Sequence, residues 1–123
     1  MIRQYTRLKV ADNTGALELS VISILGFSKK SFASVGDIVS ATVKKALPNG
    51  QIKKGTVVKA IIVRQNKEFR RADGSYVRFD DNAAVVLNEE AKDIRGTRIF
   101  GPIPREIRNS TFKKIISLAK ELI

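Results

Sequence analysis

Short stretches in which apolar and polar residues alternate follow one another along most of the chain, and each stretch predicts a β-strand. The first covers residues 5–11, where Leu8 and Val10 share one face and Arg7 and Lys9 share the other. The same alternation predicts further strands over residues 17–25, 38–46, 57–65 and 82–88.

Two of these stretches depart from simple alternation. The apolar phase of residues 17–25 shifts at Val21 and Ile22, which predicts a β-bulge. Residues 57–65 are the most apolar, so we expect this strand to be central. Short strands at such regular spacing predict a small closed β-barrel, since closure removes exposed edges. The pattern leaves both an OB-like and an SH3-like topology open.

The pattern changes after Glu89. Residues 95–110 are rich in glycine and proline, so we expect an ordered loop with at most a short helix after Pro104. The last segment is amphipathic and predicts a helix that Ser110 or Thr111 caps and that covers one open end of the barrel. Its apolar stripe, which we expect to belong to the core, consists of Phe112, Ile115, Ile116, Ala119, Leu122 and Ile123.

Residues 66–80 form a separate unit, because Asp73-Gly74 favours a two-residue hairpin turn. With that turn, Arg70 pairs with Val77, and side-chain alternation mixes arginine with apolar side chains on both faces. Neither face is then suited to a core. A solvated hairpin is one interpretation. The interpretation that we favour is a ribbon that projects from the domain and contacts a polyanion.

The composition supports a polyanionic partner. The chain has 123 residues, which predicts one domain over residues 1–123, and carries 23 lysines and arginines against 12 aspartates and glutamates. A formal net charge of +11 suits a nucleic acid or an anionic membrane. No apolar run approaches the ~20 residues of a spanning helix, and residues 1–13 lack the apolar core of a signal peptide. A nucleic acid is therefore favoured, with no membrane partner.

The residue types on which most enzymes rely are missing. The sequence has no histidine and no cysteine, which removes the usual general base and the commonest metal ligands. The pairs Asp80-Asp81 and Glu89-Glu90 would point to opposite faces of a strand and do not easily form a catalytic dyad. We therefore expect no enzymatic activity, no cofactor, no metal and no small-molecule substrate.

A longer spacing pattern lies between Ala60 and Val86: "AIIV", nine residues, "DG", four residues, "F", two residues, "N", two residues and "VV". This pattern resembles the signature of the universal large-subunit ribosomal protein fourteen. The segments "RLKVADNTGA" from residue 7, "RGTRIFGPI" from residue 95 and "KKIISLA" from residue 113 also resemble bacterial-type members. The resemblance covers essentially the whole chain, with the motifs in the same order.

The resemblance implies a fold and a set of partners. Members of this family are mainly β, with a small five-stranded β-barrel, a projecting β-ribbon and short C-terminal helices, here about residues 94–123. They are structural constituents of the large ribosomal subunit, bind its rRNA, lie at the subunit interface and contribute to intersubunit bridges. The implied partners are large-subunit rRNA, small-subunit rRNA across the interface, the neighbouring large-subunit proteins three and nineteen, and a ribosome-silencing factor. The implied location is the ribosome, in the cytoplasm or in an organelle.

Candidate site residues come from the resemblance and from the charge distribution. The resemblance implies a partner-binding surface at Thr97, Arg98 and Lys114, where the silencing factor docks in bacterial members. Basic residues are spread along the whole chain, which indicates an extended contact with RNA phosphates. The predicted RNA-binding residues are Arg7, Lys9, Lys29, Lys30, Lys44, Lys45, Lys53, Lys54, Arg64, Lys67, Arg70, Arg71, Arg78, Arg105 and Arg108.

Aromatic residues separate the two function classes that we consider. On the ribbon, we expect Phe69, Tyr76 and Phe79 to pack on RNA or on a neighbouring protein. The alternative to a ribosomal role is a free-standing nucleic-acid-binding barrel that acts outside the ribosome. Such proteins gather their aromatic residues on one sheet face, whereas here they are spread over a loop, the ribbon and the last helix.

The chain departs from the family at Lys120, where many members have proline, so we expect a longer last helix.

Overall fold

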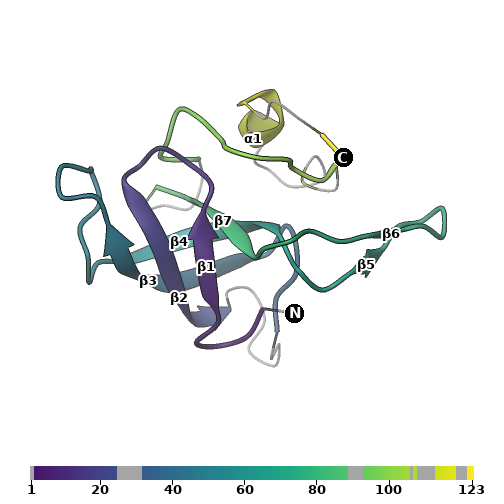
Figure 1. Cartoon of the computed structure of the whole chain (residues 1–123), viewed down its shortest axis with the longest axis horizontal. Coiled ribbons are helices and arrows are strands. Elements are labelled where there is room, and N and C mark those ends of the chain that lie inside the picture. The colour runs from purple at the N-terminus through teal and green to yellow at the C-terminus, as the bar shows by residue number, and fades with distance from the viewer. Residues whose placement is uncertain (1, 25–31, 89–92, 106, 108–112, 119–121) are drawn as a thin grey trace.

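β-branched residues and leucine dominate the alternating stretches, and such side chains favour a pleated, half-buried backbone. The computed structural model of the chain describes residues 2–24, 32–88, 93–105, 107, 113–118 and 122–123 (Figure 1). The elements in chain order are β1 (Arg7–Val10), β2 (Ala16–Ile24), β3 (Ile38–Ala46), β4 (Val57–Arg64), β5 (Phe69–Arg70), β6 (Tyr76–Val77), β7 (Ala83–Val86) and α1 (Lys113–Leu118).

Five strands close into a barrel in the order β1-β2-β3-β4-β7 (Figure 1). Each strand is antiparallel to the next one around the barrel, except that β7 pairs with β1 in parallel, at Lys9 with Ala83 and at Val10 with Ala84. An odd number of alternating strands requires this parallel closure. The predicted five-stranded barrel in a mainly β fold is confirmed, and its up-and-down order differs from the Greek key of an OB-fold.

The irregularity predicted in the second strand is also present. The register of β2 against β3 shifts between Val21 and Ser23, as expected where a strand carries an extra residue. Val21 is fully buried, whereas Ile22 is 37% exposed on the outside of the barrel. The shift confirms the bulge that the change of apolar phase predicts.

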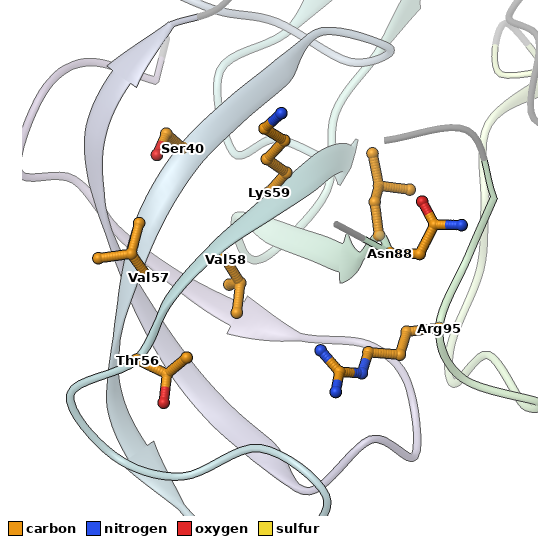
Figure 2. Close-up of a pocket in the computed structure, with 8 residues that line it drawn as sticks. Ser40, Thr56, Val57, Val58, Lys59, Asn88 and Arg95 are labelled. Atoms are coloured by element: carbon orange, nitrogen blue, oxygen red, sulfur yellow. The ribbon is translucent and has the colours of Figure 1, made fainter. Parts of the chain in front are cut away.

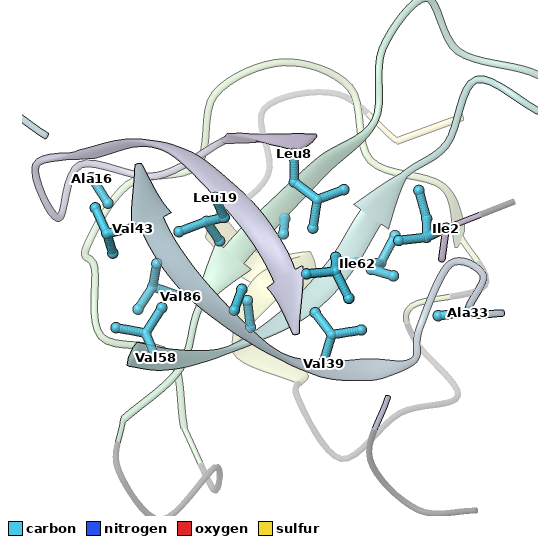
Figure 3. Packing of buried hydrophobic residues seen from close by; sticks show 14 of the residues in the cluster. Ile2, Leu8, Ala16, Leu19, Ala33, Val39, Val43, Val58, Ile62 and Val86 are labelled. Carbon is cyan, nitrogen blue, oxygen red and sulfur yellow. The ribbon is translucent and has the colours of Figure 1, made fainter. Parts of the chain in front are cut away.

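The barrel interior is filled by aliphatic side chains (Figure 3). Leu8 of β1, Leu19 of β2, Val39 of β3 and Ile62 of β4 belong to this core, and each is fully buried. Burial of one such side chain contributes about 1.5–3 kcal/mol of hydrophobic stabilisation. Because the interior is packed, polar and charged groups that meet a partner lie on the outside of the wall.

A second core lies against the outer face of that wall. In β4, Ile61 and Val63 belong to the second core, while Ala60 and Ile62 belong to the first, so the strand is buried on both faces. This confirms the central position predicted for the most apolar stretch. The fully buried Ile115 of α1 also belongs to the second core. The helix therefore packs outside the barrel wall, and the prediction that it covers an open end is wrong.

The C-terminal helix ends before the predicted position. Its described residues are Lys113–Leu118, and Leu122 instead pairs with Ile103 in a short parallel bridge. Ile123 donates its backbone N–H to the Ile103 carbonyl at 3.0 Å. The predicted helical stripe is therefore wrong for Leu122 and Ile123, which are 38% and 41% exposed. Outside the described residues lie Ser110, Thr111, Phe112, Ala119 and Lys120.

The ribbon hairpin has a different register from the predicted one. Phe69 pairs with Val77 and Arg70 with Tyr76, which is one residue away from the expected pairing. The turn contains three residues, because the Arg71 N–H donates to the Ser75 carbonyl at 2.8 Å and Gly74 adopts a left-handed φ of 90°. A type I turn followed by a left-handed glycine is the usual three-residue hairpin, so Asp73-Gly74 serves a longer turn than predicted.

Candidate nucleic-acid interface

The corrected register separates the two faces of the ribbon. A shift of one residue moves every side chain of one strand to the opposite face. One face now carries Phe69 together with Val77 and Phe79, which are only 8% and 6% exposed. The prediction that neither face suits a core is therefore wrong. Phe79 is committed to the fold and is not available to pack on RNA.

The other face of the ribbon is exposed and carries one aromatic ring, two arginines and Glu68 opposite Arg78. Arg70 and Tyr76 lie directly opposite each other across the two strands, and Arg78 lies two residues beyond Tyr76 on the same face. Both arginines are exposed, and Tyr76 is 66% exposed. An aromatic ring and guanidinium groups on one face offer a surface for a base and charged donors for phosphates. We call Arg70, Tyr76 and Arg78 the ribbon face.

The base of the ribbon is fixed by Arg64, a member of the predicted RNA-binding set. Its guanidinium forms an ion pair with Asp81, with Nε 3.0 Å from Oδ1, and donates through Nη1 to the carbonyls of Phe100 at 2.8 Å and Pro102 at 3.3 Å. The Arg64 side chain is only 10% exposed. This cation joins β4 to the segment around Gly101, so its hydrogen bonds within the fold give it a structural role.

A second arginine links the ribbon to the C-terminal segment. Arg71 is half-buried, and its Nη2 donates to the backbone carbonyl of Ile123. At the foot of the ribbon, the Asn66 N–H donates to Asn82 Oδ1 at 2.8 Å, and Asn66 Nδ2 donates to the Asp80 carbonyl at 3.0 Å. These bonds connect the two strands where they leave the barrel, so the ribbon face is held in a defined direction.

The barrel itself carries further predicted RNA-binding residues. Arg7 and Lys45 both approach Glu18, at 3.1 and 3.7 Å, so part of their charge is compensated. Lys67 forms an exposed ion pair with Glu68 at 3.5 Å. The other described members of the set that are exposed are Lys9, Lys44, Lys53, Lys54 and Arg105. Lys29, Lys30 and Arg108 lie outside the described residues.

Thr97 and Arg98 lie on a rigid loop at the barrel surface. Asn13 Oδ1 accepts from the Thr97 N–H at 2.9 Å and from the Arg98 N–H at 3.1 Å, and Asn13 Nδ2 donates to Thr97 Oγ1 at 2.9 Å. A Cβ at Gly96 would lie 2.8 Å from Asn13 Oδ1, so the bonds need a glycine there. Both side chains are exposed, and we call Thr97 and Arg98 the platform. The side chain of Lys114 lies outside the described part of the chain.

The residue before Asn13 fixes the platform to the barrel. Asp12 is buried, and its carboxylate accepts from the Val86 N–H at 2.8 Å and from the N–H and hydroxyl of Thr14 at 3.2 and 2.7 Å. Burial raises the pKa of Asp12 above its ordinary value, although the hydrogen bonds from Thr14 and Val86 oppose this. Asp12 therefore joins the start of the β1–β2 turn to β7, and the adjacent Asn13 extends the connection to the platform.

The comparison with known families agrees with this geometry. The chain matches the family described as ribosomal protein L14p/L23e over residues 1–123. The chain belongs to this family. As a member of the L14p/L23e family, it is a structural protein of the large ribosomal subunit. Its place is the ribosome, in the cytoplasm or in an organelle. Within the described residues, no helix is long and apolar enough to cross a membrane.

Sequence patterns do not reveal several residues that build the L14p/L23e surface. Asn13 bonds a loop 84 residues away, and a chain position next to a turn gives no sign of that. Lys59 and Arg95 line one pocket although the pattern places one on a central strand and the other in a loop. The segment "ADNTG" carries a signal only as part of the resemblance, and nothing in its pattern marks its aspartate as buried.

Proposed function

We propose that the chain binds large-subunit rRNA through the ribbon face and through exposed lysines and arginines of the barrel. The observation that supports this most directly is the register that brings Arg70, Tyr76 and Arg78 onto one exposed face. Phosphate contacts from arginine and lysine supply most of the affinity in such complexes, and an aromatic ring adds a stacking surface. The +11 net charge has the sign that this role needs.

The proposed position is at the subunit interface. There the platform side of the barrel contributes to intersubunit bridges with small-subunit rRNA, and large-subunit proteins three and nineteen are the proposed protein neighbours. In this arrangement, the platform also docks a ribosome-silencing factor. The support for a docking role is rigidity: Asn13 accepts two hydrogen bonds and donates one, and these hold Thr97 and the Arg98 backbone in place, which lowers the ordering cost of binding.

Loss of the ribbon face should weaken RNA binding without unfolding the protein. The Arg70→Ala, Tyr76→Ala double variant is expected to raise the Kd for large-subunit rRNA about thirtyfold, from roughly 1 kcal/mol for each of two lost contacts. Both side chains are exposed, so the circular dichroism spectrum and melting temperature should stay close to those of the unmodified protein. Filter binding at one fixed salt concentration measures the Kd.

The matched control removes the same two residue types from the segment before β1. Arg3 and Tyr5 are both exposed, with Tyr5 at 74%, and neither belongs to the predicted set. The Arg3→Ala, Tyr5→Ala variant should bind nearly as tightly as the unmodified chain. An equal loss in both variants would show that binding depends on total charge and aromatic content, and would argue against the ribbon face.

Charge reversal on the platform should slow docking of the silencing factor. Arg98→Glu is expected to reduce the association rate about tenfold at low salt, because a rim charge steers the encounter more than it sets the affinity. Large subunits that carry the variant should still assemble. Stopped-flow mixing of purified subunits with the factor gives the rate, and Arg3→Glu is the control reversal at another exposed arginine. Equal rates for both variants would place the docking surface elsewhere.

A further inference from the structure

A pocket of about 310 Å³ lies beside β4, and none of its described lining residues belongs to the ribbon (Figure 2). Strand β4 forms one side, and the segment that follows β7 forms the other. Figure 2 shows Lys59 and Val58 on opposite sides of strand β4, and Arg95 on the segment, toward the side of Val58. The residues that line the pocket are Ser40, Thr56, Val57, Val58, Lys59, Leu87, Asn88 and Arg95.

Backbone hydrogen bonds determine where the two cations lie. Lys59 pairs with Ser40 across β3 and β4, and its carbonyl accepts from the Leu87 N–H at 2.8 Å. The Arg95 N–H donates to the Val86 carbonyl at 3.0 Å. Both cations are therefore carried by backbone that is bonded to the barrel wall. Little conformational entropy of the backbone would be lost when a ligand binds to them.

The charge of this pocket is uncompensated among its lining residues. None of the eight described residues that line it is acidic, and neither Lys59 nor Arg95 forms an ion pair within the described part of the chain. A second pocket, near the ribbon, differs in this respect, because Asp80 and Asp81 line it together with three basic residues. Among the described residues, no carboxylate neutralises the cations at Lys59 and Arg95, and both can therefore pair with an anion.

The other lining groups narrow the class of anion. Ser40 and Thr56 supply hydroxyl groups, which are common donors to phosphate oxygens beside lysine and arginine. Val57 adds an apolar surface that is 61% exposed, and such a surface suits the carbon face of a ribose. A pocket that combines cations, hydroxyls and an exposed apolar floor matches the mixed chemistry of a sugar-phosphate backbone.

We propose that this pocket binds a backbone segment of large-subunit rRNA, with Lys59 and Arg95 each neutralising a phosphate. The inference rests on the proposed rRNA-binding function and adds a second contact region on a different side of the barrel. Neither residue belongs to the set predicted from the sequence. The pocket chemistry is independent of base identity, so it anchors RNA without reading its sequence.

The test measures the salt dependence of binding to a complete large-subunit rRNA transcript. Each neutralised phosphate contributes roughly 0.7–0.9 to the slope of log K against log salt, so the Lys59→Gln, Arg95→Gln variant should lose about 1.5 from the slope. The control Arg7→Gln, Lys45→Gln removes two cations that share Glu18, and should lose less. Ethylation of individual phosphates before binding identifies those that matter. If ethylation of a phosphate blocks binding of the unmodified protein but not of the pocket variant, this pocket contacts that phosphate.

The outcomes of this experiment distinguish failure of the pocket proposal from failure of the proposed rRNA binding. A smaller slope together with such a set of phosphates supports the proposal. If the pocket variant keeps the slope of the unmodified protein while the ribbon variant loses affinity, the pocket proposal is overturned and the proposed rRNA binding remains. The pocket would then suit an acidic segment of a neighbouring protein. If the unmodified protein itself binds the transcript without salt dependence, the proposed rRNA-binding function and this inference fail together. Urea unfolding of the variant shows that any change does not reflect loss of the fold.

Discussion

Replacement of Arg64 by alanine should lower the free energy of unfolding by about 3 kcal/mol, since removal of one partner from a buried ion pair leaves the other charge poorly solvated. Asp81 is 25% exposed and loses its partner, while the carbonyls of Phe100 and Pro102 lose their donor. For a domain of this size, that loss corresponds to a melting temperature lower by about 10 °C. Thermal and urea unfolding followed by circular dichroism measure both quantities.

The conservative variant distinguishes geometry from charge. Arg64→Lys keeps the charge but cannot donate to Asp81 and to two carbonyls at once, so it should recover less than half of the lost stability. If Arg64→Ala instead weakened rRNA binding and left the stability within about 1 kcal/mol of the unmodified protein, a typical effect of a surface substitution, the assignment of Arg64 to RNA contact would be correct.

Alanine at Gly15 should destabilise the fold by about 3 kcal/mol, from ~1 kcal/mol for a left-handed backbone and ~2 kcal/mol for overpacking. Gly15 has a φ of 100°, and a Cβ there would lie 2.6 Å from the Gly50 Cα. The Gly15 carbonyl also accepts from the Leu47 N–H at 2.8 Å, which joins the turn after β1 to the loop after β3. Chemical denaturation is the direct measurement.

Two other glycines separate the cost of the left-handed backbone from the cost of overpacking in Gly15→Ala. Gly55 has a similar φ of 90°, and a Cβ added there would meet nothing within 4 Å, so Gly55→Ala should cost only about 1 kcal/mol. Gly50 has no left-handed φ, but its Cβ would lie 2.8 Å from the Gly15 Cα, so Gly50→Ala isolates the overpacking. If Gly15→Ala cost no more than Gly55→Ala, the two loops would have to separate easily.

The barrel strands are predictable because their signal is local. Alternation over a few residues identifies each strand, and a stretch that is apolar on both faces, such as β4, indicates cover on both sides. The position of the helix is not predictable in the same way. Its apolar stripe says that Ile115 is buried but not against which face of the barrel, and the second core outside β4 decides that question.

The ribbon shows how a small local error changes a functional prediction. Asp73-Gly74 is compatible with a two-residue and a three-residue turn, and only the backbone bond between Arg71 and Ser75 distinguishes them. The difference of one residue interchanges the faces, so that Phe79 becomes core and Tyr76 becomes surface. The sequence shows that the ribbon contains arginines. Which of them bond within the fold and which are exposed depends on this register.

Long-range hydrogen bonds account for what the residue pattern cannot show. Arg64 looks like any other basic residue until Phe100 and Pro102 are brought to it from 36 and 38 positions away. Asn13 likewise acquires its role from a loop that is distant in sequence. Neither periodicity nor composition carries such information, whereas the resemblance to known family motifs locates the platform without explaining how it is held.

The parallel pair between β1 and β7 has a consequence for synthesis of the chain. β1 ends at Val10 and its closing partner spans Ala83–Val86, so a growing chain cannot complete the barrel until most of its 123 residues have been made. Until then, β1 and β4 each present an unpaired edge that can pair with another chain. Contacts this distant in sequence also slow folding. A nascent chain is therefore exposed to aggregation until β7 has been made and has closed the barrel.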